Sequence, residues 1–154
     1  MISRCYLEIT NVCNLDCLFC PKTERKGRTM SVEEFELLTD RLAGRIKFLY
    51  FHLMGEPLMH RHLPDFVRMA KAKGFIPVLT TNGTLLDRAG DALLEALPHK
   101  VQISLHSHEG NGKDAPEEYV RQVMTFAQKA ARLGVIVVLR LWNQGGYDKD
   151  NERL

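Results

Sequence analysis

Four cysteines stand within the first 20 residues of this 154-residue chain, at positions 5, 13, 17 and 20. Three of them, Cys13, Cys17 and Cys20, form a C-x3-C-x2-C pattern. Thiolates are soft ligands that suit zinc or an iron–sulfur cluster. In a reducing compartment, such a group of cysteines binds metal or does redox chemistry more often than it forms disulfides. The pattern therefore indicates a metal or redox site near the N-terminus.

The number of thiolates decides which metal the pattern fits. A closed zinc site takes four ligands, usually as two close pairs, and the chain has no second C-x2-C pair. Cys5 starts the preceding predicted strand, which at about 3.3 Å per residue holds it away from the loop. Three thiolates leave one iron of a [4Fe–4S] cluster without a protein ligand. The spacing favours such a cluster with an open iron; zinc and free redox thiols stay open, as does the role of Cys5.

Five short apolar runs, each typical of a β-strand, must position the cysteine loop and its partners. The predicted strands are residues 5–10, 47–53, 76–81, 100–105 and 135–141. Amphipathic stretches with helical spacing separate them. Strand and helix in alternation predict βαβ units around a parallel sheet, so the expected fold class is α/β.

Four predicted helices have recognisable ends. Ser31 and Glu34 have the spacing of a capping box, and glycine or proline stands where each helix stops. The helices are expected over residues 31–44, 64–74, 85–97 and 116–134. His60 and His62, just before the second helix, are expected on the surface or as a helix cap.

Polar side chains recur on one side of the predicted strands. Gln102, Ser104 and His106 share one parity of the fourth strand, while Glu8 and Arg140 are polar positions of the first and fifth. A parallel sheet covered on both faces has strands that are apolar throughout. The pattern favours a polar face that lines a ligand-filled cavity, as in a partial barrel, where sites lie at the carboxyl ends of the strands. Scattered polar residues near strand ends are the alternative.

Composition narrows the function classes. With 21 basic and 19 acidic residues the net charge is +2, which argues against nucleic-acid binding and against a polybasic tail. The chain is 45% hydrophobic and 26% charged, as in globular proteins, and its length predicts one domain over residues 1–154. It has neither an apolar stretch of about 18 residues nor a signal-peptide pattern. We therefore expect a cytoplasmic protein with no membrane association.

Three motifs on successive strand ends together resemble the radical S-adenosylmethionine (radical SAM) superfamily. The C-x3-C-x2-C pattern has an aromatic residue, Phe19, just before its last cysteine. Residues 54–58, Met-Gly-Glu-Pro-Leu, resemble the Gly-Gly-Glu-Pro motif of that superfamily, with Met54 in place of the first glycine. Residues 81–83, Thr-Asn-Gly, resemble its common turn after the third strand. The resemblance covers nearly the whole chain and implies a partial parallel (β/α) barrel.

The resemblance also implies a ligand for each motif. Cys13, Cys17 and Cys20 would hold a [4Fe–4S] cluster whose open iron binds the amino and carboxylate groups of S-adenosylmethionine (SAM). Backbone carbonyls of Gly55, Glu56 and Pro57, with the Glu56 carboxylate, would accept hydrogen bonds from the methionyl ammonium. The alternative is that residues 55–57 form a plain turn.

Four further residues are carried over as cofactor contacts. Phe19 would pack near the adenine, and Asn82 and Ser104 would contact the cofactor from strand ends. Arg140 would pair with the methionyl carboxylate, and a salt bridge to Glu8 is its alternative. His106 would face the ribose or the substrate, or serve as a wall residue. No catalytic side chain is assigned.

The implied activity is reductive cleavage of SAM to a 5′-deoxyadenosyl radical that abstracts hydrogen from a substrate, and the first hypothesis is an enzyme that modifies a peptide or protein. The implied partners are a reductant, such as flavodoxin or ferredoxin, and a small-molecule or peptide substrate. A glycyl-radical-enzyme activase is one alternative, against which Val12 before Cys13 counts, because a glycine is usual there. A non-catalytic zinc or redox module is the other.

The chain holds less than the six strand–helix units that the resemblance implies. Five strands and four helices are predicted, which favours a fragment of a longer protein over a minimal member. The fifth strand would then be an open edge. Basic residues follow the cysteine loop and form either a solvated loop or a docking patch for an acidic partner: Lys22, Arg25, Lys26 and Arg28.

Overall fold

The computed structural model of the chain describes residues 3–108 and 117–141, in which strands and helices alternate as predicted. The order is β1 (Arg4–Tyr6), α1 (Val32–Leu42), β2 (Phe48–Phe51), η1 (Pro57–Met59), α2 (Leu63–Ala72), β3 (Ile76–Thr81), α3 (Leu86–Ala96), β4 (Lys100–Ser104), η2 (Leu105–Ser107), α4 (Glu117–Arg132) and β5 (Ile136–Arg140). The elements η1 and η2 are single 3₁₀ turns.

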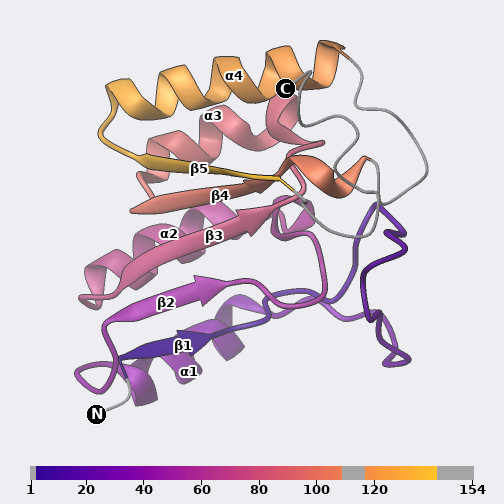
Figure 1. Cartoon of the computed structure of the whole chain (residues 1–154). Coiled ribbons are helices and arrows are strands. Elements are labelled where there is room, and N and C mark those ends of the chain that lie inside the picture. Colours follow the sequence, from indigo (N-terminus) through magenta and orange to yellow (C-terminus); the bar gives the residue numbers. More distant parts are fainter. Residues whose placement is uncertain (1–2, 109–116, 142–154) are drawn as a thin grey trace.

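The five strands form one parallel sheet in the order β1-β2-β3-β4-β5. Figure 1 shows their arrowheads at one edge, where the loop after β1 also lies. Each strand pairs with the one before it in the chain, which is the arrangement of consecutive units in a barrel wall. The predicted α/β class and parallel sheet are confirmed.

The structure corrects the predicted strand ends at the cysteine side. The first strand was expected to run to Thr10, but its ladder with β2 ends at Tyr6. After Tyr6 the chain pairs instead with its own returning segment, because Met30 N donates to Ile9 O (2.8 Å) and Thr10 bridges Thr29. The fourth strand ends at Ser104 because a 3₁₀ turn begins there. The strands thus end earlier than predicted, at the points where the loops of the site begin.

The two faces of the sheet differ as the strand patterns predict. Alternate side chains such as Leu49, Phe51 and Ile103 are fully buried in a core against the helices, which pack on that face. The opposite face carries polar and aromatic side chains, including Gln102 on β4 and the half-exposed Tyr6. A polar face without a helical cover is the side on which a cofactor or substrate can approach the carboxyl ends of the strands.

The helix ends follow the predicted signals. At the start of α1, Glu34 N donates to Ser31 Oγ (3.2 Å) and Ser31 N donates to the Glu34 carboxylate (2.9 Å), which completes the capping box. No helix among the described residues is long and apolar enough to cross a membrane. On the far edge of the sheet, Ile136 and Leu139 of β5 are exposed, and β5 pairs only with β4 in the described part of the chain.

His60 is buried, contrary to the surface position expected from the sequence. Its Nδ1 accepts from His62 N (3.1 Å) and its Nε2 lies 2.9 Å from Met30 O, which suits a neutral ring that donates from Nε2. Burial, with the nearby His62 and Arg61, lowers the pKa of His60 below its usual value. Protonation would therefore oppose folding.

We expect acid to destabilise the fold through His60. Because its pKa is lower in the folded chain, the unfolded chain binds the proton first as the pH falls below about 6.5. The free energy of unfolding then decreases by at most about 1.4 kcal/mol per pH unit, the limit for one proton. Urea unfolding between about pH 7 and pH 5 tests this. The variant His60→Gln, which cannot titrate, should show a weaker dependence; an equal slope would contradict the assignment.

Candidate metal and cofactor site

The cysteine loop lies at the carboxyl edge of the sheet and encloses a cavity of about 270 Å³. All three cysteines of the motif line this cavity, together with Met54. Cys17 and Cys20 are half-buried, and Cys13 is exposed. Cys5 sits on β1 and does not line the cavity, in agreement with the spacing argument.

Three soft thiol donors line one cavity and suit an iron–sulfur cluster with three protein ligands. In residues 3–108 and 117–141, no three His, Cys, Asp or Glu side chains are already gathered as a metal site. Although Cys13 as a whole is exposed, partial desolvation of its sulfur, with the nearby Glu56 and Cys20, raises the pKa of its thiol.

Hydrogen bonds from Asn11 to Lys26 and Arg28 hold the two ends of the cysteine loop together. The side chain of Asn11 accepts from Arg28 N (2.6 Å) and donates to Lys26 O (3.1 Å), and Asn11 N donates to Arg28 O (3.1 Å). The sequence analysis noted no role for Asn11. Its polar type beside a motif was the signal available, because Asn side chains often bond nearby backbone groups in loops.

We expect Asn11→Ala to loosen the two ends of the cysteine loop. The change removes an acceptor and a donor, at about 1 kcal/mol for each partly exposed bond. The loop should then lose a bound cluster to a chelator several-fold faster than the wild type. Asn11→Asp is the matched control, because it keeps the acceptor for Arg28 N. Its rate of cluster loss should lie between those of the wild type and Asn11→Ala. Identical rates in all three proteins would contradict this role.

The basic segment after the loop pairs with the chain's own acids. Arg25 Nη1 lies 2.7 Å from Glu8 Oε1, Lys22 Nζ lies 2.8 Å from Asp16 Oδ1, and Arg28 forms an ion pair with Glu34. Three of the four cations are thus balanced locally. The observation favours the solvated loop over the docking patch.

Gly55 allows the Gly-Glu-Pro segment to lie directly against the backbone at the start of the cysteine loop. A Cβ at this position would lie 2.3 Å from Thr10 O and 2.8 Å from Val12 O, so only glycine fits. The next residue, Glu56, donates from its backbone N to Val12 O (2.9 Å). The segment before Cys13 and the Gly-Glu-Pro segment are therefore joined backbone to backbone.

The Glu56 side chain is buried and turned toward the third motif. Its Oε1 accepts from Leu58 N (2.9 Å) and Thr81 Oγ1 (2.7 Å), and its Oε2 accepts from Asn82 N (2.7 Å). Only 2% of the residue is exposed. Burial raises the pKa of this carboxyl, and the three hydrogen bonds oppose that shift. The carboxylate thus connects the loops after β2 and β3.

Asn82 connects the third motif to the cysteine loop. Its Nδ2 donates to Asn14 Oδ1 (3.0 Å) and lies 4.0 Å from Cys13 Sγ, within reach of a long hydrogen bond to sulfur. Asn14 Nδ2 donates in turn to Thr84 Oγ1 (2.8 Å). The sequence analysis placed Asn82 in the site but assigned no partner to it. Asn14 and Thr84 were missed as a pair because they are far apart in the chain.

The remaining predicted residues gather on the side of β4 and β5. Phe19 meets His106 with ring centroids 5.0 Å apart, and Cys17 Sγ lies 3.7 Å from Ser107 O. Ser104 is buried and lies in register with Arg140 on β5. Phe19 and Cys17 thus bring the cysteine loop against the turn that follows β4.

Arg140 does not form the salt bridge that was its alternative assignment. Glu8 is paired with Arg25 instead, and its Oε2 also accepts from Met54 N (3.2 Å). Within the described residues Arg140 has no ion pair, and its backbone carbonyl lies 3.2 Å from His106 Nδ1. Its charge contributes, after burial, to the lowered pKa of His52 and of His106. The guanidinium is thus available to an anionic ligand on the polar face.

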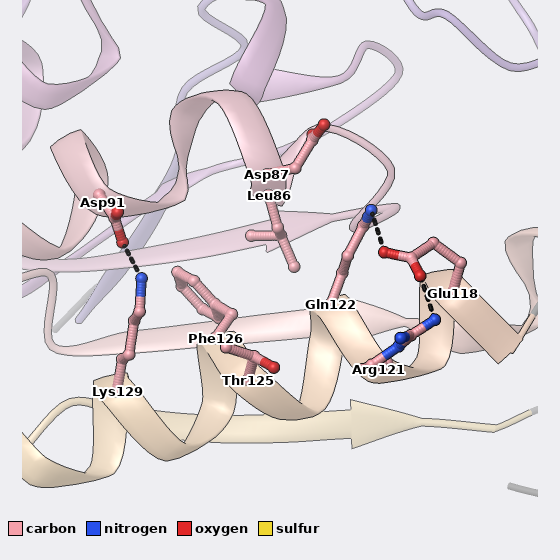
Figure 2. Close-up of a pocket in the computed structure, with 9 residues that line it drawn as sticks. All are labelled: Leu86, Asp87, Asp91, Glu118, Arg121, Gln122, Thr125, Phe126 and Lys129. Atoms are coloured by element: carbon pink, nitrogen blue, oxygen red, sulfur yellow. Dashed lines mark hydrogen bonds and ion pairs between the residues drawn. The ribbon is translucent and has the colours of Figure 1, made fainter.

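A second hollow lies between α3 and α4, outside this site. Figure 2 shows its floor of Leu86 and Phe126, with the ion pair between Lys129 and Asp91 (2.7 Å) at one end. Glu118 binds Arg121 and Gln122 at the other end. The hollow measures about 210 Å³ and includes no cysteine. Lys129 pairs with Asp91 and Arg121 with Glu118, and we assign the hollow no ligand.

Comparison with known proteins identifies the family of the chain. The model of the radical SAM superfamily matches residues 7–153. The chain therefore belongs to the radical SAM superfamily. It is 41% identical over 107 residues to a GTP 3′,8-cyclase of Chlorobaculum tepidum, covering 64% of this chain and 31% of that protein. It is 37% identical over 83 residues to an Fe-coproporphyrin III synthase of Methanosarcina barkeri, covering 52% and 21%.

Solved structures show the same fold. BtrN in complex with AdoMet and 2-DOIA has a TM-score of 0.69 at 22% identity, covering 91% of this chain and 57% of that one. Streptococcus suis SuiB bound to the precursor peptide SuiA has a TM-score of 0.71 at 15% identity, covering 99% and 36%. The chain thus spans about a third or less of the two sequence relatives named above.

Proposed function

We propose that this chain provides the SAM-cleaving core of a radical SAM enzyme. Cys13, Cys17 and Cys20 hold a [4Fe–4S] cluster, and the backbone of residues 55–57 binds the methionyl amino group. When bound and reduced, the cluster supplies one electron, which cleaves SAM into methionine and a 5′-deoxyadenosyl radical that takes a hydrogen atom from the substrate. The observation that carries the proposal is the single cavity lined by all three cysteines beside the Gly-Glu-Pro segment.

The other predicted contacts have supporting geometry. The Arg140 guanidinium, without an acidic partner in the described residues, suits the methionyl carboxylate. Phe19, beside His106, is placed to pack on the adenine, and Ser104 offers a hydroxyl from the end of β4. Asn82 stands between the Gly-Glu-Pro segment and Cys13. These side chains bind and orient the cofactor and exclude water, while the cofactor carries the chemistry.

For the substrate we propose a small molecule rather than a peptide. Two relatives, at 41% and 37% identity, are named GTP 3′,8-cyclase and Fe-coproporphyrin III synthase. The neighbour bound to a precursor peptide is only 15% identical and supports the fold alone. A flavodoxin or ferredoxin would supply the electron. We place the reaction in the cytoplasm, where the thiols stay reduced.

Anaerobic reconstitution tests the proposal. The chain, supplied with iron and sulfide, should take up about four irons, and with dithionite and SAM it should release 5′-deoxyadenosine. Uptake of zinc without a cluster would overturn the proposal in favour of a binding module. A cluster without SAM cleavage would overturn the assignment of this activity to the chain itself.

A further inference from the structure

Asn82 lies where four segments of the chain meet. Its backbone N donates to Glu56 Oε2 (2.7 Å), and its backbone carbonyl accepts from Tyr119 Oη (2.8 Å). Its side-chain Nδ2 reaches the cysteine loop, 3.0 Å from Asn14 Oδ1 and 4.0 Å from Cys13 Sγ. The main chain of Asn82 is therefore held on both sides while its amide is directed at a predicted cluster ligand.

The Glu56 carboxylate already accepts three hydrogen bonds from the chain's own donors. It accepts from two backbone N–H groups and one hydroxyl, all within 2.9 Å. An ionised carboxylate can accept from all three, whereas an amide of the same shape carries two donors of its own. The Thr81 hydroxyl extends the arrangement, because its Oγ1 also accepts from Gly83 N (3.0 Å). The whole turn at residues 81–83 is thus built around this carboxylate.

We propose that the Glu56 carboxylate is a positioning group, which fixes the turn at residues 81–83 so that Asn82 donates to the Cys13 sulfur, and not a direct ligand of SAM. The proposal rests on the proposed function, since it takes Cys13 as a cluster ligand. A hydrogen bond to a ligand sulfur stabilises the more negative, reduced cluster and raises its reduction potential. Glu56 would then influence the potential through Asn82, without touching the cofactor.

The test is the reduction potential of the reconstituted chain without SAM. In Glu56→Gln, an amide NH₂ faces at least one of the three donors and displaces the turn. We expect the reduction equilibrium constant to fall about three- to tenfold, where tenfold is 59 mV for one electron. Asn82→Ala should give a similar fall, and the double variant no further one, because both changes break the same link.

A direct role in SAM binding predicts a different result. Glu56→Gln would then weaken SAM binding and leave the potential of the SAM-free cluster unchanged, which would overturn the proposal. A wild-type chain that takes up no cluster would contradict the proposed function, and the positioning role would be refuted with it. The two failures are distinguished by the iron and sulfide content of the wild type.

A milder variant covers the case in which Glu56→Gln fails to fold. Tyr119→Phe keeps the buried ring against Gly83 and removes only the hydroxyl that donates to Asn82 O. It should lower the potential in the same direction by a smaller amount. Tyr50→Phe is the matched control. The Tyr50 ring stacks on that of Tyr6, with centroids 4.8 Å apart, and does not take part in the hydrogen bonds around Asn82. Equal potentials in Tyr119→Phe and Tyr50→Phe would overturn the proposal.

Discussion

We expect Cys17→Ala to abolish both cluster binding and SAM cleavage, because it removes one of three thiolates. Two thiolates leave two irons of the cluster without protein ligands, and alanine at the half-buried position 17 supplies no ligand in exchange. Iron content after anaerobic reconstitution should fall at least tenfold, with no 5′-deoxyadenosine above background.

Cys5→Ala is the control for this prediction. Cys5 is half-buried on β1, and its thiol lies 3.7 Å from Tyr6 O, outside the cavity that the other three cysteines line. The variant should keep the iron content and the activity of the wild type. Loss of the cluster in Cys5→Ala, or its retention in Cys17→Ala, would show that the ligand set is wrong.

Among the glycines that the structure describes, Gly55 should be the one where an added methyl group, as in Gly55→Ala, disrupts the fold most. The added Cβ meets two backbone oxygens, Thr10 O at 2.3 Å and Val12 O at 2.8 Å, and backbone cannot rotate away as a side chain would. Overpacking of this kind costs about 3 kcal/mol. At about 2–4 °C per kcal/mol for a chain of this size, the melting temperature should fall by roughly 6–12 °C.

Gly27→Ala separates this clash from a general effect of glycine replacement. The nearest atom to its added Cβ is Val12 Cγ2 at 3.5 Å, an ordinary contact. Gly27→Ala should therefore melt within about 2 °C of the wild type, since surface changes rarely exceed 0.5 kcal/mol. Equal melting temperatures for the two variants, measured by circular dichroism of the apo chain, would refute the close approach at Gly55.

Hydrophobic patterning predicted the architecture because the pattern is dense in every element. Apolar residues at alternating and helical spacing located all five strands and four helices, and the capping box at Ser31 located the start of α1 to the residue. The strand ends at the cysteine side were predicted too long. There the ladder competes with the segment that returns from the cysteine loop, and a pairing between residues 9–10 and 29–30 has no local signal.

The candidate site residues were proposed chiefly where a motif is continuous in the sequence. The cysteines, the Gly-Glu-Pro segment and the Thr-Asn-Gly turn were proposed in this way. Tyr119, 37 residues beyond its partner Asn82, was not. The direction of the Glu56 carboxylate was also out of reach, because it depends on which of several nearby donors the folded backbone presents. Such contacts belong to the assembled loops and to no single segment.

The order of the sheet has a consequence for biosynthesis. Because each strand pairs with its predecessor, the sheet can grow strand by strand as the chain leaves the ribosome, N-terminus first. The cysteines follow the first strand, but two groups that contact the site are synthesised much later. These are Ser107 O, which lies beside Cys17 Sγ, and the Tyr119 hydroxyl, which donates to Asn82 O. A nascent chain that ends before α4 therefore carries the three thiols before all residues around the cysteine loop are present. With the proposed function, iron and sulfide are therefore expected to bind after α4 has been synthesised and the fold around the cysteine loop has formed.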